Sequence, residues 1–316
     1  TLFDLYRDDP DPGLHGAVEW LLRQWHQGNR LKALDEQLAQ DRAQAKRGWY
    51  INGQGQTMVV VHGPVEFMMG SPANDADRRS DERLHKRQIY RGFAIATTEV
   101  TVEQWDRFLR AKPDLRSVFT ANTEYKERHY PDAAGPQCEI TWYEATLYCN
   151  WLSAQAGLPE DEWQYGRADN EGRTRVLPGY ENKVHTGYRL PIEAEWEYAC
   201  RAGAVTSRYF GATERLLDRY AYYDLNSQKR AWPAAGLKPN DLGLFGMLGN
   251  ALEWCEDYNK SAHGQHVRNF VYDDSCMLRG GSFINRARFE RVDWRTSDLA
   301  QYRSYLVGFR VARTLR

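Results

Sequence analysis

The chain has 316 residues, and its 42 Lys and Arg residues nearly balance 43 Asp and Glu residues, so that the formal net charge is -1. The mean hydropathy is -0.73, and no apolar run is long enough to cross a bilayer, which excludes a membrane-spanning protein. Because the charge is balanced, the composition does not point to nucleic acid as a partner.

The cysteine pattern bears on compartment and on metal binding. Five cysteines are widely spaced along the chain, at Cys138, Cys149, Cys200, Cys255 and Cys276. None belongs to a CxxC pair, so the pattern does not indicate a zinc knuckle. An odd number at wide spacing favours buried thiols in a reducing compartment over a disulfide framework. Since no basic and apolar leader follows Thr1, we expect a cytoplasmic protein.

A helical hairpin is predicted near the N-terminus. The turn cluster Asp9–Gly13 leads into Leu14–Trp25, where apolar residues recur at helical spacing. A second helical run is expected over Arg30–Ala45. The hairpin is either the end of a helical repeat or a cap packed on the main domain. His15 and His26 have no acid at metal-ligand spacing on the same face, and we expect both at the solvated surface.

From Trp49 onward the pattern changes to strands, turns and short helices. β-Branched and apolar residues over Thr57–His62 predict a strand, which Gly63-Pro64 ends. Phe67–Pro72 predicts a short strand that enters a turn. The polar stretch 73–85 that follows is expected to be a surface loop.

Three helix starts are readable further along. Capping boxes, in which two side chains bond each other's backbone N–H groups, are predicted for Thr101 with Gln104 and for Thr141 with Glu144. The third helix follows Leu190-Pro191, and Ile192 occupies its cap position, where it cannot cap through its side chain. Gly203 is expected to stop this helix. Beyond it the chain is loop-rich, and such irregular chain needs dense packing or a bound ion to hold it.

The most informative stretch lies near the C-terminus. Arg279–Phe283 and Val307–Arg310 flank an irregular middle, 284–306, in which aromatic and small polar residues are interleaved with Arg. Binding surfaces favour this mixture. The alternative is a pair of buried core strands, but Arg and Asp recur on both parities, which favours an exposed surface. Four arginines can anchor the loops by bidentate pairs or contact a partner themselves: Arg288, Arg291, Arg295 and Arg303.

Together these blocks resemble the formylglycine-generating enzyme family, also called the sulfatase-modifying-factor family. The matching segments stand in the family's order: Phe67–Pro72, Phe93–Thr101, Ile140–Ser153, Gly187–Gly203, Asn240–Trp254 and Arg279–Arg310. The resemblance implies an α+β, loop-rich C-type lectin-like fold over 49–316, with residues 1–48 as an N-terminal helical segment.

The resemblance places the family's two catalytic cysteines near Asn285 and Glu290 of this chain. Asn and Glu cannot supply thiolate ligands for Cu(I), nor can they form a disulfide with a substrate. Cys276 precedes the frame and can replace at most one thiol. Related oxygenases of the ergothioneine type bring iron ligands in an HxxxHxE pattern, which the N-terminal hairpin lacks. We therefore expect no copper, no iron and no catalysis.

A third group with this fold is the variable proteins of diversity-generating retroelements, which display a hypervariable C-terminal surface on a constant frame. Mutation at adenines gives their variable positions a set of residues without Lys, Glu, Gln, Met and Trp. Seven positions matched to variable ones all fall within that set: Ile284, Phe289, Thr296, Tyr302, Ser304, Tyr305 and Leu306. Glu290, Trp294 and Gln301 fall outside it and are expected to be constant scaffold.

The sequence therefore predicts a non-catalytic binding protein with a candidate variable region at 279–310. Its predicted ligand-binding residues are Ile284, Arg286, Arg288, Phe289, Asp293, Trp294, Thr296, Tyr302, Ser304, Tyr305 and Leu306. A broad aromatic face suits a protein partner, whereas acids interrupt the positive field that nucleic acid requires, at Glu290, Asp293 and Asp298. The alternatives are a divergent oxidase or oxygenase, and a regulatory domain of a multidomain kinase or protease.

Enzymes of the family also hold two calcium ions, and the resemblance carries both sites over. The first would use the side chains of two asparagines and two backbone carbonyls: Asn226, Asn240, Ser227 and Leu242. The second would use the carboxylate of Glu253 with the carbonyls of Gly249 and Ala251, although Gly246 stands where an Asn or Asp ligand is expected. Oxygen ligands of this kind suit Ca²⁺. The alternative is that the two asparagines are turn residues that bond local backbone.

Overall fold

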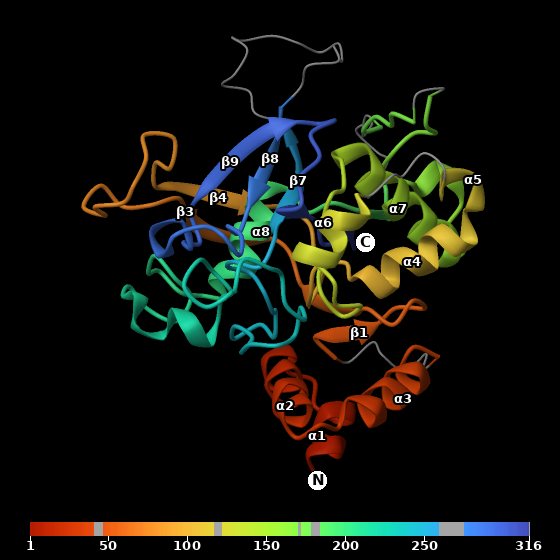
Figure 1. Ribbon diagram of the computed structural model, residues 1–316, viewed down its shortest axis with the longest axis horizontal. Coiled ribbons are helices and arrows are strands. Elements are labelled where there is room, and N and C mark those ends of the chain that lie inside the picture. Colours follow the sequence, from red (N-terminus) through yellow and green to blue (C-terminus); the bar gives the residue numbers. More distant parts are fainter. Residues whose placement is uncertain (41–46, 117–121, 170–171, 178–183, 259–274, 316) are drawn as a thin grey trace.

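The computed structural model describes the chain except for residues 41–46, 117–121, 170–171, 178–183, 259–274 and 316 (Figure 1). Its helices are α1 (Leu2–Asp8), α2 (Pro12–Gln24), α3 (Gly28–Leu38), α4 (Val102–Ala111), α5 (Pro113–Arg116), α6 (Thr123–His129), α7 (Trp142–Gln155) and α8 (Glu193–Arg201), with short 3-10 turns η2 (Glu160–Glu162), η3 (Glu214–Arg219) and η4 (Ala287–Phe289). Its strands are β1 (Trp49–Ile51), β2 (Thr57–Val61), β3 (Val65–Met69), β4 (His85–Ile89), β5 (Phe93–Ala96), β6 (Tyr188–Arg189), β7 (Leu252–Tyr258), β8 (Ser275–Arg279), β9 (Arg295–Leu299), β10 (Val307–Gly308) and β11 (Ala312–Thr314).

Two sheets and a two-stranded ribbon form the frame. The five-stranded sheet has the order β1-β2-β5-β11-β6, and the four-stranded sheet has the order β10-β7-β8-β9. The ribbon pairs β3 with β4. The last strand, β11, lies between β5 and β6. Strands from the two ends of the region 49–316 therefore belong to the same sheet, so that segments far apart in the chain are paired within it.

Much of the aromatic content of the chain lies in the core. Helix α7 is buried on most sides, and its Tyr148 stacks on Trp105 of α4 with ring centroids 5.8 Å apart. Phe309, from the C-terminal end of the frame, meets the same tyrosine edge-on at 5.4 Å. Aromatic pairs of this geometry stabilise a core beyond the area they bury.

The predicted helix starts agree with the structure. Capping boxes begin α4 at Thr101 and α7 at Thr141. Ile192 gives α8 no side-chain cap, but Glu195 accepts a hydrogen bond from the Ile192 N–H at 3.1 Å. Helix α8 ends one residue before Ala202, which takes a left-handed conformation with φ of 46°.

The N-terminal helices gather at one end of the molecule beside β1 (Figure 1). The prediction that His15 lies at the surface is wrong: its side chain is 1% exposed. Its ring stacks between Tyr6 at 4.1 Å and Trp49 at 3.6 Å, because α2 turns this face toward β1. Burial lowers the pKa of His15 to about 4, so the ring is neutral near neutral pH.

Helix α2 packs on the main domain through glycine. A Cβ atom on Gly16 would lie 2.6 Å from the Cα atom of Gly243, and one on Gly13 would lie 2.2 Å from the carbonyl oxygen of Asp241. Only a residue without a side chain permits such close approach. Of the two alternatives for the helical segment, the structure shows a cap packed on the domain.

We expect Gly16→Ala to lower the free energy of unfolding by about 1–3 kcal/mol, because the added methyl group meets backbone that cannot move easily. Gly28→Ala is the matched control, since a Cβ atom there meets nothing within 4 Å; we expect it to be neutral or to stabilise α3 by up to about 1 kcal/mol. Urea unfolding of the two variants measures the difference. Equal stabilities would show that the close approach of α2 is not a constraint.

Candidate functional site

The candidate site is framed by Arg279–Phe283 and Val307–Arg310, and Arg279 is the first residue of this frame. Its side chain is fully buried and donates to the carboxylate of Glu197 on α8 at 2.6 Å. It also donates to three consecutive backbone carbonyls: Val292 at 2.8 Å, Asp293 at 3.1 Å and Trp294 at 2.8 Å. This guanidinium therefore holds residues 292–294, which precede β9, against α8.

Arg310 ends the frame in the same way. It is fully buried, and its Nε and one terminal nitrogen each lie 2.6 Å from an oxygen of Glu253 on β7. Its remaining donors reach the carbonyls of Ala96, Thr97 and Phe245 at 3.0–3.3 Å. The bidentate geometry and the additional acceptors offset the cost of removing two charges from water.

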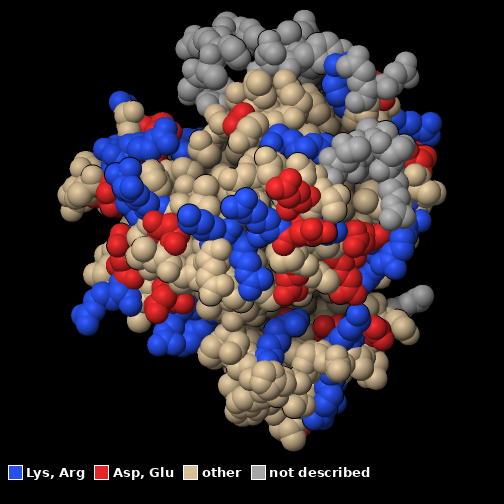
Figure 2. Space-filling model, in the orientation of Figure 1, with Lys and Arg blue, Asp and Glu red and all other residues tan. Residues whose placement is uncertain are grey.

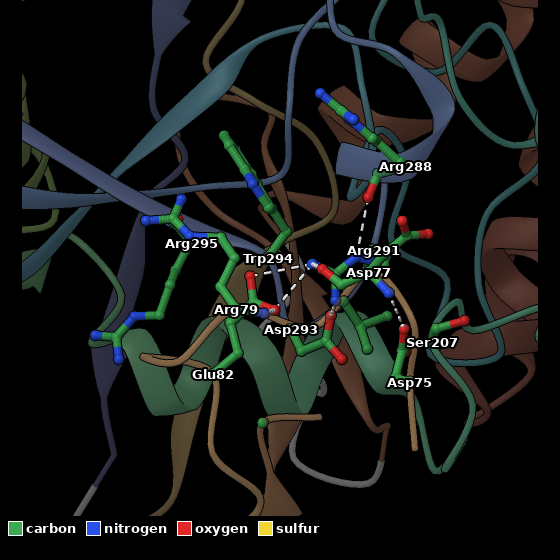
Figure 3. Close-up of polar contacts among 12 residues, drawn as sticks. Asp75, Asp77, Arg79, Glu82, Ser207, Arg288, Arg291, Asp293, Trp294 and Arg295 are labelled. Atoms are coloured by element: carbon green, nitrogen blue, oxygen red, sulfur yellow. Dashed lines mark hydrogen bonds and ion pairs between the residues drawn. The ribbon is translucent and has the colours of Figure 1, made fainter. Parts of the chain in front are cut away.

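Arg291 holds the middle of the segment (Figure 3). It is 2% exposed and pairs with Asp293 at 2.6 Å and with Glu82 at 2.9 Å. Figure 3 shows its guanidinium between these two carboxylates, next to the backbone of Asp77. Glu82 belongs to the stretch predicted as a surface loop, but it is 2% exposed, because Arg291 draws it inward.

Two further predicted anchors also form ion pairs. Arg295 pairs with Glu193 of α8 at 2.5 Å, and Arg303 pairs with Glu144 of α7. Arg288 differs: it is exposed, and its guanidinium lies over the ring of Phe289 at 4.7 Å. Three of the four arginines therefore act as loop anchors, and the fourth points toward solvent.

The predicted ligand-binding residues divide into buried and displayed ones. Asp293 and Trp294 are 2% and 6% exposed, so they lie beneath the surface rather than on it. Glu290 is buried as scaffold should be, whereas Gln301 is exposed. The displayed residues, which are exposed or half-buried, are Ile284, Arg286, Arg288, Phe289, Thr296, Tyr302, Ser304, Tyr305 and Leu306.

The displayed residues lie against segments that the sequence did not connect with them. Arg208 donates to the carbonyl of Ala287 at 2.8 Å, beside the displayed Phe289. Tyr305 stacks on His129 of α6 with centroids 4.3 Å apart. Helix α6 was not predicted; the spacing of Tyr125 and His129 by four residues is the signal that could have found it.

Asn285 and Glu290, at the positions that the resemblance matches to cysteine, have different surroundings. The Asn285 side chain accepts a hydrogen bond from the Ser282 hydroxyl at 2.7 Å. Glu290 is fully buried, and no donor among the described residues completes a hydrogen bond with its carboxyl. A Cβ atom on Gly281 would lie 2.5 Å from that carboxyl, so the frame needs glycine there.

Burial raises the pKa of the Glu290 carboxyl well above its usual range, against the opposing effect of the backbone N–H groups of Gly249 and Ser282 that face it. Removal from water disfavours the charged form of an acid, so burial favours the protonated carboxyl here.

The prediction of buried thiols is confirmed. All five cysteines are free and buried. Burial raises the pKa of four of them: Cys138, Cys149, Cys200 and Cys255. A reactive cysteine needs an accessible thiolate, and none of these side chains provides one.

The asparagines of the first predicted calcium site bond local backbone. Asn226 accepts from the Tyr223 N–H at 2.8 Å and donates to the Ala221 carbonyl at 2.9 Å. Asn240 accepts from the N–H groups of Leu242 and Leu244 at 3.1 and 3.0 Å. The Ser227 carbonyl accepts from the indole of Trp232 at 2.6 Å. Asn240 also donates to the carbonyls of Ala199 and Cys200 near the end of α8, at 2.8 and 3.2 Å. Calcium at this site stays a prediction.

The carboxylate of the second predicted calcium site is already engaged. Both oxygens of Glu253 are held by Arg310, and one also accepts from the Trp196 indole at 2.8 Å. Calcium at this second site also stays a prediction. In the part of the chain that the structure describes, no group of three His, Cys, Asp or Glu residues is placed to hold a metal ion, and no helix is long and apolar enough to cross a membrane.

Comparison with known proteins agrees with this frame. The family model of the sulfatase-modifying factor enzyme 1-like domain matches residues 50–315. The chain belongs to this family. It is 29% identical to the formylglycine-generating enzyme of Streptomyces coelicolor over 199 residues, which cover 56% of this chain and 52% of the enzyme. This sulfatase-modifying-factor chain thus spans about half the length of that relative.

Two further similarities span more of the chain. Chaperone protein LppX of Paenibacillus barcinonensis is 29% identical over 224 residues, 64% of this chain and 73% of LppX. The solved structure of Treponema denticola variable protein 1 superposes with a TM-score of 0.64 at 24% identity, covering 82% of this chain and 95% of that one. The predicted fold class, a loop-rich α+β fold of the formylglycine-generating-enzyme type, is confirmed.

Arg310→Met leaves Glu253 buried without its cation, and we expect it to lower the free energy of unfolding by about 3–5 kcal/mol. Combining it with Glu253→Gln removes the unpaired charge and should recover part of that loss. Arg288→Met is the matched control at an exposed position, with an expected change within about 0.5 kcal/mol. Urea unfolding measures all three, and a wild-type value for Arg310→Met would contradict the role given to the pair.

Glu290→Gln tests the buried carboxyl. Its pKa in the folded chain lies above the ordinary value of 4.5, so the stability that protonated Glu290 contributes is full below that value. The stability is lost as the pH rises toward the folded pKa, because the unfolded chain releases the proton. We expect Glu290→Gln to gain melting temperature relative to wild type as the pH rises above the ordinary glutamate pKa of 4.5. Parallel curves of melting temperature against pH would contradict this.

Proposed function

We propose that this chain is a non-catalytic binding protein that presents a diversified, protein-binding surface on residues 284–306. The observation that carries the proposal is the division of this segment into two kinds of residue. Arg291 is buried and pairs with two carboxylates, while Ile284 and Tyr302 are each 39% exposed. Substitution of the exposed residues leaves the buried, ion-paired residues in place, and these hold the fold.

The surroundings of the matched cysteine positions support a non-catalytic role. Thiol chemistry of the formylglycine-generating kind requires two accessible thiolates close together. Here the Asn285 side chain accepts a hydrogen bond from Ser282, and Glu290 is a buried acid whose pKa is raised by burial. The five thiols of the chain are buried elsewhere, so none can take over the reaction.

The displayed chemistry supports a protein as the partner. Tyr and Arg are enriched at the energetic centres of protein interfaces, and both recur among the displayed residues. Lys and Arg side chains are interspersed with Asp and Glu side chains over the face in Figure 2. A polyanion prefers a field of one sign, whereas a folded protein can complement both.

The first test randomises five displayed positions, Ile284, Arg286, Arg288, Tyr302 and Ser304, in the full chain displayed on yeast. The probe is purified lysozyme. We expect folded library members to bind it, with melting temperatures within a few degrees of wild type, because exposed substitutions change stability by about 0.5 kcal/mol or less. The control library randomises Arg279, Arg291 and Arg310 and should yield unfolded chains. Absence of any lysozyme binder from the folded members would reject the display function.

Diversification is tested separately in the DNA around the gene. We expect a near-copy of the codons for 279–310 that differs at adenines, next to a reverse transcriptase gene. A neighbourhood with neither would reject diversification and leave a constant binding surface.

A further inference from the structure

A cluster of aromatic rings joins α6 to the displayed segment. We call it the aromatic face; it consists of Tyr125, His129, Phe283 and Tyr305. His129 stacks on Tyr305 with centroids 4.3 Å apart and an interplanar angle of 15°, and it lies nearly parallel to Phe283 at 6.1 Å. Tyr125 completes the contact with Tyr305 at 5.4 Å. The ring of a displayed residue is thus held by residues outside the displayed segment.

His129 is itself fixed by the backbone on its far side. Its Nδ1 lies 3.0 Å from the Lys229 carbonyl oxygen, and its own carbonyl accepts from the Ala231 N–H at 2.7 Å. Both contacts join the last residue of α6 to the loop 224–232. The imidazole plane is therefore set before any partner arrives.

The same loop supplies a second ordered ring. Trp232 donates its indole N–H to the Ser227 carbonyl at 2.6 Å and its backbone N–H to the Asn250 side chain at 3.0 Å. The guanidinium of Arg230 lies 3.8 Å above the indole ring. An aromatic ring and an arginine held rigidly beside each other resemble the residues that dominate binding energy at protein interfaces.

Further exposed apolar side chains lie on the loop 224–232 and on the displayed segment. Leu225 is 79% exposed, Ile284 and Tyr302 are each 39% exposed, and Tyr125 of the aromatic face is 40% exposed. The Asp224 N–H bonds the Asn285 carbonyl at 3.0 Å, which places Leu225 close to Ile284. Large apolar side chains that converge at a protein surface mark an interaction site.

We propose that α6 and the loop 224–232 form a constant half of the partner-binding surface, in which His129 positions the ring of Tyr305 against a folded protein partner. This inference rests on the proposed function and adds to it. The displayed residues then vary beside a pre-ordered set of rings, so less conformational entropy is lost on binding.

The charges around the aromatic face favour a folded protein over a polyanion. Three exposed acids, Glu124, Glu127 and Asp224, lie on the same segments as exposed cations at Arg128, Lys229 and Arg286. A polyanion would meet three like charges here. A protein surface offers both signs around an apolar centre, as ordinary interfaces do.

The positioning role of His129 is tested without a partner, by ¹⁹F NMR of the chain labelled with 3-fluorotyrosine. Tyr305→Phe assigns the Tyr305 signal. We expect His129→Ala to remove the ring-current shift of this signal and His129→Phe to retain it, since a phenyl ring can stack in the same place. Arg128→Ala, the exposed neighbour on α6, is the control and should leave the signal unchanged. An unchanged signal in His129→Ala would overturn the positioning role.

The composite surface is tested with the lysozyme-binding variants described above, in which Tyr305 is kept. We expect His129→Ala and Trp232→Ala each to raise the Kd for lysozyme about tenfold, as truncation of an interface anchor does. The control is Arg91→Ala, an exposed arginine between β4 and β5 and outside the proposed surface, which should change the Kd less than about twofold. Melting temperatures check that each variant is folded. Binders that tolerate both substitutions would overturn this inference and leave the display function standing, whereas a library without binders rejects the display function itself.

Two other occupants are tested on the wild-type chain. Heparin binding that protects α6 from hydrogen exchange would replace the protein partner by a polyanion. Self-association in sedimentation that Tyr125→Ala abolishes would make the occupant a second copy of this chain. Either result overturns the proposed partner, and we expect neither.

Discussion

The buried pair between Arg310 and Glu253 is the interaction on which the loop-rich half depends. It joins β7 to the segment between β10 and β11, and the remaining donors of Arg310 bind the backbone at the end of β5 and the loop at Phe245. Because a buried charge without a partner is costly, none of these segments can move away alone. One side chain thus couples the two sheets more strictly than apolar packing would.

Arg279 and Arg291 are also buried arginines that hold the surrounding loops. Each binds a carboxylate from a distant segment, and each also satisfies loop carbonyls that regular secondary structure would otherwise pair. Loops fixed from beneath in this way need few contacts from their outward side chains. The division of 284–306 into buried anchors and displayed residues follows from that arrangement.

Local signals in the sequence predicted local structure well. The capping boxes at Thr101 and Thr141, the strand beginning at Thr57 and the buried thiols are all found, because neighbouring residues decide them. The errors share a cause: Glu82 is drawn inward by Arg291, His15 is covered by Trp49, and Asp293 lies beneath the surface. Each depends on a residue far away in the chain, which hydrophobic periodicity and spacing cannot reveal. Helix α6 was missed for a different reason: none of its residues is buried, so it carries no hydrophobic periodicity.

The carboxyl of Glu290 lies against Gly281, and this contact limits which residues can stand at position 290. A cysteine there would be shorter by several atoms and would leave a void beside the glycine, at a cost in stability that grows with the void. A larger residue at a neighbouring position would have to fill that void. Either change made alone gives a less stable protein, so the packing around one glycine couples the evolution of these positions.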